Sequence, residues 1–275
     1  GVSQKIEEGY FKDLGVNTIW LSPITQNPTD AWGLWDKGKV KSKFSGYHGY
    51  WPISNVKVDY RFGAAADVNS LLDKAHAKDN NVILDYVANH VHLNHPVYQN
   101  NKDWATSLYL PDGTKNTEKW DEYRLTTWFD DHLPTLDLRR YAIVDPMVDS
   151  AMVWLTQYNF DGFRHDATKH IDELYWRTLT YRIRQKTQQP IYQIGETYGS
   201  PALINSYIST GMLDAQFDFN LYDAAVNTFA QGKDHQNLLT VLEQGLKTYG
   251  YHHLMGNISG NQDRSRFISL ASGDV

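Results

Sequence analysis

A short apolar run precedes each of four acidic residues in this 275-residue sequence: Asp85, Asp166, Glu196 and Asp263. The intervals between them fit successive strand–helix units. An α/β barrel brings the carboxyl ends of its parallel strands to one rim, where barrel enzymes carry their active sites. Carboxylates gathered there can serve as nucleophiles and as general acids and bases. The pattern therefore predicts a catalytic rim.

The segment 162–170, GFRHDATKH, places Arg164 two residues before Asp166 at the end of an expected strand. Side chains two apart on a strand point to the same face. A guanidinium beside a carboxylate keeps the carboxylate ionised and oriented, as a nucleophile requires. The alternative interpretation is a structural ion pair, with Lys169 and His170 as an ordinary helix start.

Two further acids follow apolar segments later in the chain. Glu196 lies in IGET, where desolvation at the end of a buried strand would raise its pKa and suit a general acid. Alternatively, it is a helix-start glutamate near the helix dipole. Asp263 lies in SGNQDRSR, and its alternative role is a turn or capping aspartate paired with Arg264 or Arg266.

Alternating strands and helices must position these residues. Helices are expected at 4–14, 65–79, 143–158, 171–187, 201–208, 221–231 and 236–248. Strands are expected at 17–22, 82–85, 160–164, 190–195, 215–219 and 254–258. Such alternation favours a parallel sheet with right-handed crossovers. Six strands fall short of the eight in a closed barrel, so the barrel is expected to be incomplete.

Residues 91–140 break this rhythm with three prolines, many aromatic residues and no clear period. We interpret 91–140 as a subdomain inserted in one loop, and 1–90 with 141–275 as the barrel domain. Five aromatic residues of the insertion could stack on sugar rings, but we expect most of them to form its own small core: Tyr98, Trp104, Tyr109, Trp120 and Trp128.

The composition excludes several classes of function. The net charge is −6, which gives no basic footprint for nucleic acid. No apolar run is long enough to span a membrane. The sequence has no cysteine, so disulfides and thiol catalysis are excluded. With no His-x-x-x-His pair either, a catalytic zinc is not expected around Asp85, Asn89 and His90.

Together these segments resemble the conserved regions of the α-amylase family of glycoside hydrolases. The resemblance covers nearly the whole chain and rests on LGVNTIWLSPI (14–24), GYHGYWPIS (46–54), DYVANH (85–90), LPTLDL (133–138), GFRHDATKH (162–170), GET (195–197) and GNQD (260–263). It implies a (β/α)8 TIM-barrel catalytic domain, of which the family's first and eighth strands are expected to be absent here.

The resemblance also assigns roles. It implies that Asp166 is the nucleophile, Glu196 the general acid/base and Asp263 the stabiliser of the oxocarbenium-like transition state. Arg164 would orient Asp166, with Asp85 beneath it. Two carboxyl groups about 5–5.5 Å apart give double displacement with retention of configuration.

Other positions match the family's substrate contacts. His90 would bond the sugar in the cleaved subsite, Tyr50 would stack on it, and Lys169 and His170 would line the leaving-group side. One position departs from the family pattern: Gln262 stands where a histidine is usual, and it can donate a hydrogen bond but cannot carry charge. This departure predicts reduced activity or altered specificity.

The sequence thus predicts an α-glucan hydrolase that cleaves α-1,4 or α-1,6 bonds in starch-like polysaccharides or maltooligosaccharides, of amylase or neopullulanase type. The alternatives are a transglycosylase with the same machinery and a catalytically silent glucan-binding member. The resemblance implies a periplasmic or extracellular bacterial location. No cofactor is expected for the chemistry, and Asn89 matches a frequent ligand of structural calcium. The oligomeric state is left open.

Overall fold

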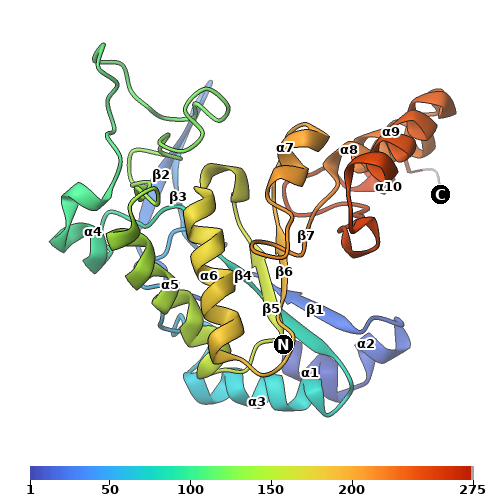
Figure 1. Cartoon of the computed structure of the whole chain (residues 1–275), viewed down its shortest axis with the longest axis horizontal. Helices are drawn as coiled ribbons and strands as arrows, with labels where there is room; N and C mark the ends of the chain where they lie inside the picture. The colour runs from blue at the N-terminus through green and yellow to red at the C-terminus, as the bar shows by residue number, and fades with distance from the viewer. Residues whose placement is uncertain (274–275) are drawn as a thin grey trace. The chain divides into compact units, whose positions relative to one another are not determined.

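The computed structural model describes residues 1–273, which form two compact units, Gly1–Tyr192 and the residues from Gln193 onward (Figure 1). The first unit carries a parallel sheet in the order β1-β4-β5. Its strands are β1 (Thr18–Leu21), β4 (Asn81–Tyr86) and β5 (Gly162–His165). The helices around them are α1 (Val2–Glu7), α2 (Tyr10–Asp13), α3 (Ala65–His76), α5 (Tyr141–Thr156) and α6 (Glu173–Lys186).

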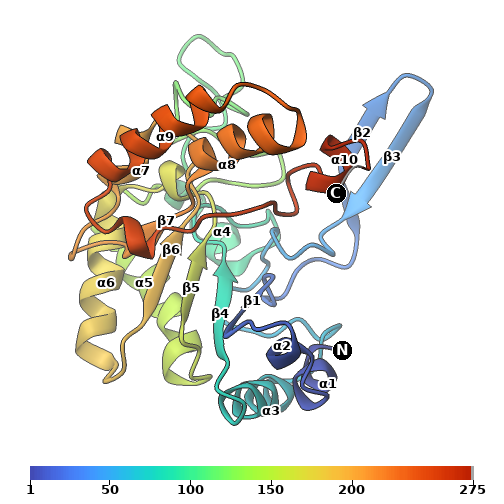
Figure 2. The ribbon, with the colours of Figure 1, turned by 90° about the vertical axis from the view of Figure 1, so that its right-hand side faces the viewer.

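Strand β4 is central in this sheet because both of its neighbours pair with it in parallel. Its residues from Val82 to Tyr86 are all buried, as expected of a strand covered on both faces. Helices α5 and α6 pack against each other, and α1 packs against α3 (Figures 1 and 2). Close strand packing requires Gly162, because a Cβ there would lie 2.1 Å from the Tyr192 carbonyl oxygen.

The hairpin of β2 (Ala31–Lys37) and β3 (Val40–Ser45) was not predicted from the sequence. Its two antiparallel strands extend away from the sheet of the first unit (Figure 2). Two residues connect the strands, and Gly38 has a φ of 62°. A glycine at the first position of a two-residue hairpin loop is the local signal for such a turn.

The segment 91–140 is largely irregular, as expected. It contains α4 (Pro96–Asn100) and the 3-10 turn η1 (Lys102–Trp104), with isolated bridges such as Ala105↔Leu136. Trp128 forms the expected core and donates from Nε1 to the Thr106 carbonyl at 3.0 Å. Tyr109 and Trp120 lie outside this core and are 54% and 37% exposed. The domain boundaries themselves stay a prediction.

The second unit pairs β6 (Tyr192–Gly195) with β7 (Ala215–Gln216) in parallel. Its helical elements are α7 (Pro201–Ser206), α8 (Phe219–Ala225), the π-helix η3 (Val226–Ala230), α9 (His235–Thr248), η4 (His252–Leu254) and α10 (Phe267–Leu270). The predicted helices at 201–208, 221–231 and 236–248 correspond to these elements within a few residues.

The prediction of a sixth strand at 254–258 is wrong. Only Gly256 pairs there: its N–H donates to the Gln216 carbonyl at 3.0 Å and its carbonyl accepts from Asp218 N–H at 3.0 Å. The ladder cannot continue because Asp218 is already the N-cap of α8, accepting from the Leu221 N–H at 3.0 Å. The sheets of residues 1–273 therefore contain five parallel strands, not six.

Candidate functional site

A buried ion cluster stands where β4 and β5 end. Asp85 and Arg164 are register partners on the two strands. The Arg164 Nη1 donates to Asp85 Oδ1 at 2.8 Å and to Asp166 Oδ1 at 3.0 Å. Arg164 and Asp85 are fully buried, while Asp166 is 9% exposed. One guanidinium nitrogen thus ties a buried carboxylate to a second one that solvent can reach.

Two aromatic residues also bond Asp85. Its Oδ2 accepts hydrogen bonds from the Tyr50 hydroxyl at 2.7 Å and from Trp20 Nε1 at 3.1 Å. The Arg164 guanidinium carbon lies 5.1 Å from the centre of the Trp20 ring, in cation–π range. Burial and the Asp85 carboxylate raise the pKa of Tyr50 above its usual range, so the hydroxyl remains a donor.

Asp166 follows β5 directly, and its N–H donates to the Tyr86 carbonyl on the neighbouring strand at 3.1 Å. The next residue, Ala167, has a φ of 51°, in the left-handed region that residues with a Cβ rarely adopt. Strain of this kind is found at functional sites, where the surroundings hold the backbone. The chain then forms the 3-10 turn η2 (Thr168–His170), which carries two predicted site residues.

Residues of the segment 91–140 hold Lys169 and His170 in place. Lys169 Nζ donates to Asp121 Oδ1 at 2.7 Å, and Arg124 Nη1 donates to the Lys169 carbonyl at 2.7 Å. The His170 Nδ1 lies 2.8 Å from the Arg124 carbonyl, and burial lowers the His170 pKa to about 4. Sequence reasoning missed Asp121 and Arg124, because no local pattern links a loop residue to a turn more than forty residues later.

His90 is a neutral, buried side chain. It lies after β4, its Nε2 is 3.0 Å from the Tyr50 carbonyl, and burial lowers its pKa to about 4. The Phe129 ring stands between two histidines, 4.8 Å from His90 and 5.0 Å from His170 between ring centres. The structure therefore brings His90 and His170 together on the two sides of Phe129, and His90 also contacts the Tyr50 backbone.

Asn89 has one feature expected of a calcium ligand. Its buried Oδ1 has no hydrogen-bond partner among the described residues, while its Nδ2 lies 3.5 Å from Thr135 Oγ1. An unpaired amide oxygen fits calcium, which takes six to eight oxygen ligands, including backbone carbonyls and water. Within residues 1–273, no group of three acidic, histidine or cysteine side chains is arranged to hold a metal ion.

The second unit carries the other two predicted catalytic residues. Glu196 follows β6 directly and is partly buried. Asp263 is exposed, and its N–H donates to Asn261 Oδ1 at 3.0 Å. Gln262 is also exposed. The neighbouring Arg264 forms its ion pair with Asp223, at 3.9 Å.

Comparisons with known proteins agree with the fold. A family model described as "Alpha amylase, catalytic domain" matches residues 1–275. An α-amylase of Streptomyces lividans is 25% identical over 90% of this chain and 32% of its own length. A cyclomaltodextrinase of Thermoanaerobacter pseudethanolicus is 24% identical over 100% of this chain and 46% of its own.

The crystal structure of an α-amylase from Geobacillus thermoleovorans, complexed with acarbose, superposes with a TM-score of 0.82 at 29% identity. The match covers 99% of this chain and 57% of that one. These likenesses confirm the predicted fold class, a (β/α)8 barrel present in part. The chain spans about a third to a half of the length of these curated relatives. In residues 1–273, no helix is long and apolar enough to cross a bilayer.

Proposed function

This chain belongs to the α-amylase catalytic-domain family, and from that premise we propose that it cleaves α-glucosidic bonds in starch-like glucans. The observation that carries the proposal is the ion cluster of Asp85, Arg164 and Asp166. Arg164 is held from below by a fully buried carboxylate, so its guanidinium is fixed in place. It therefore keeps Asp166 ionised and aimed at the end of β5, where a substrate can reach it.

The proposed chemistry is a double displacement. The Asp166 carboxylate attacks the anomeric carbon while the bond to the leaving sugar breaks and Glu196 donates a proton to the leaving oxygen. Glu196 then takes a proton from water, which attacks the same carbon and releases Asp166. Asp263 bonds ring hydroxyls and stabilises the positive charge of the transition state.

The remaining predicted residues bind the sugar. His90 is neutral at physiological pH and donates its Nε2 proton to the Tyr50 carbonyl, so only its Nδ1 can accept from a sugar hydroxyl. Lys169 and His170 face the leaving-group side. Tyr50 offers its ring, since its hydroxyl is committed to Asp85. Gln262 can donate a hydrogen bond where a cation is usual in the family.

The test is reducing-sugar release from starch, pullulan and cyclodextrin by the 275-residue chain. Asp166→Asn should lower the rate about 10³-fold or more, because the amide cannot form the glycosyl-enzyme. Asp36→Asn is the matched control, since Asp36 forms an exposed ion pair with Lys41 on the hairpin. Hydrolysis that survives undiminished in Asp166→Asn would refute the assignment of the nucleophile.

Two further measurements define the reaction. Proton NMR of the first product should show the α-anomer before mutarotation, which distinguishes retention from inversion. Cleavage of pullulan to products of defined size separates α-1,4 from α-1,6 specificity, for which we propose α-1,4 as the main bond.

A transglycosylase is a second candidate because a cyclomaltodextrin glucanotransferase of Bacillus sp. (strain 1-1) is 23% identical over 97% of this chain. Products longer than a maltotriose substrate would indicate transfer to sugar in place of water. Glucan binding without any turnover would instead indicate a silent member of the family.

We also propose a structural calcium ion with Asn89 Oδ1 as one ligand, and a location outside the cytoplasm. The ion would tie the end of β4 to its surroundings and take no part in bond cleavage. The unpaired Asn89 oxygen supports this ion, and the polymeric nature of the proposed substrate supports the location.

A further inference from the structure

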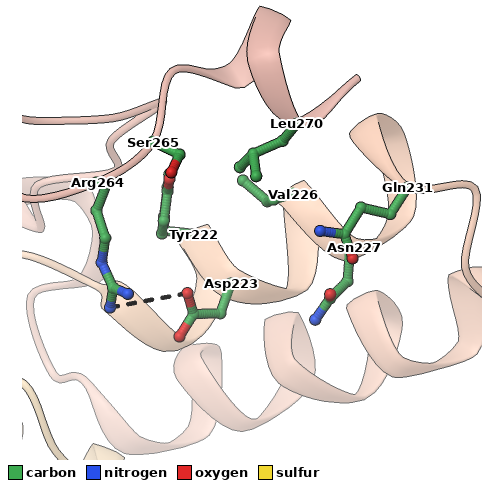
Figure 3. Close-up of a pocket in the computed structure, with 8 residues that line it drawn as sticks. All are labelled: Tyr222, Asp223, Val226, Asn227, Gln231, Arg264, Ser265 and Leu270. Atoms are coloured by element: carbon green, nitrogen blue, oxygen red, sulfur yellow. Dashed lines mark ion pairs between the residues drawn. The ribbon is translucent and has the colours of Figure 1, made fainter. Parts of the chain in front are cut away.

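A pocket of about 340 Å³ lies within the second unit, beside the loop that carries Asp263. Helix α8 and the π-helix η3 form one wall, and Arg264, Ser265 and α10 form the other (Figure 3). Volumes of this order suit small-molecule sites. The eight lining residues are Tyr222, Asp223, Val226, Asn227, Gln231, Arg264, Ser265 and Leu270.

One end of the pocket is a fixed pair of opposite charges. Arg264 lies 3.9 Å from Asp223 Oδ1, and the Tyr198 hydroxyl donates to Asp223 Oδ2 at 2.8 Å. The Arg264 guanidinium carbon is 4.5 Å from the Tyr198 ring centre and 5.7 Å from that of Tyr222. The aromatic rings hold the guanidinium, and the long ion pair leaves both partners able to bind a third group.

The rest of the pocket is neutral. Val226 and Leu270 point toward one another in the middle, and Asn227 and Gln231 stand at the far end (Figure 3). Lys233 Nζ donates to Asn227 Oδ1 at 2.8 Å and so orients the amide. Asn227 belongs to a π-helix, a rare conformation that occurs often at functional sites.

We propose that this pocket binds one glucose unit of an α-glucan, outside the pair of sugars joined by the cleaved bond. A guanidinium that donates and a carboxylate that accepts match two neighbouring hydroxyls of a pyranose. The apolar middle suits its C–H face, and the amides suit the remaining hydroxyls. Because the lining charges cancel, a neutral polyol fits better than an anion such as phosphate. The inference rests on the proposed function for the identity of the sugar.

The test uses the 275-residue chain carrying Asp166→Asn, so that the sugar is not consumed. Valine and leucine methyl groups are labelled, and their NMR signals are followed as maltotriose is added. The Val226 and Leu270 signals should shift to saturation. The signal of Leu239, exposed on α9 and outside the pocket lining, should stay constant.

Two substitutions test the pocket in different ways. Asn227→Ala removes a hydrogen bond and should weaken maltotriose binding at the Val226 and Leu270 signals by about threefold to tenfold. Gln231→Trp fills the pocket from its exposed rim and should abolish the shifts. Gln236→Ala, an exposed position on α9, is the matched control and should leave the affinity unchanged.

Unchanged Val226 and Leu270 signals at saturating maltotriose would overturn the inference, as would equal shifts with inorganic phosphate. The readout is independent of turnover. If the chain binds maltotriose in this pocket but does not degrade starch, only the proposed hydrolysis is refuted. If the chain degrades starch but the Val226 and Leu270 signals do not shift, only the proposed sugar site is refuted.

Discussion

Replacing Asp85 with asparagine should destabilise the first unit far more than its small change of shape suggests. Asp85 accepts from Arg164 on Oδ1 and from Tyr50 and Trp20 on Oδ2, and every partner is a donor. An amide has only one accepting oxygen. Its NH2 group must therefore face either the Arg164 guanidinium or the Tyr50 and Trp20 donors. The buried guanidinium also loses the negative charge of its fully buried carboxylate partner.

The size of the effect follows from burial. Removing one partner of a buried pair costs about 3–5 kcal/mol, because the remaining charge stays in a low-dielectric interior. With a urea dependence of about 3 kcal/mol/M, the unfolding midpoint should fall by roughly 1 M or more. The control Asp36→Asn removes an exposed pair with Lys41, and such pairs contribute about 0–1 kcal/mol.

The measurement is urea unfolding followed by near-ultraviolet circular dichroism, in parallel with Asp166→Asn and the double variant. Because the same Arg164 nitrogen bonds both carboxylates, the two destabilisations should not add. A midpoint for Asp85→Asn equal to that of the exposed control would show that the cluster is not held by this carboxylate. Strict additivity would show that Arg164 does not couple the two acids.

Three more outcomes are expected. Burial lowers the pKa of His92 and His95 from 6.5 to about 4, so the unfolded chain takes up protons first and stability is lost as the pH falls from 6.5 toward 4. Each histidine contributes roughly 3 kcal/mol to this loss, and a melting temperature that is flat over this range would contradict it. Ala167→Gly should remove the strain of the left-handed backbone at this position and raise the free energy of unfolding by about 1 kcal/mol. An unfolding midpoint that is unchanged or lower would contradict this. Removing calcium with a chelator should lower the melting temperature of the unaltered chain but not of Asn89→Ala; an equal fall in both would exclude Asn89 as a ligand.

The sequence predicted the parts of the site that depend on strand ends. Asp85, Arg164 and Asp166 follow apolar runs whose strands are parallel neighbours, so their meeting follows from topology. The helices were predictable because their apolar spacing and capping residues are local, as with Asp172, which caps α6 by accepting from the Leu174 N–H at 3.0 Å. The joint action of Asp166 with Glu196 and Asp263 stays a prediction.

The features that could not be predicted depend on residues that are distant in the sequence. Trp20 could not be assigned to Asp85, since a tryptophan near the end of an apolar strand is ordinarily a core residue, and the sequence does not show where its N–H donates. The β2–β3 hairpin carried a signal at Gly38, but β3 is almost entirely exposed and so shows no alternation of buried and exposed residues. The expected strand at 254–258 failed because the Asp218 cap ended its partner, an event outside the segment itself.

The bonds from Asp121 and Arg124 to η2 have a consequence for the order in which the chain acquires its structure. A ribosome makes 91–140 before it makes β5 and the turn with Lys169 and His170. The loop with Asp121 and Arg124 is therefore made before the turn that it bonds, although the rest of the segment bonds within itself and to residues made earlier. This loop should remain open to proteases on nascent chains that stop short of His170, and become protected once that turn emerges.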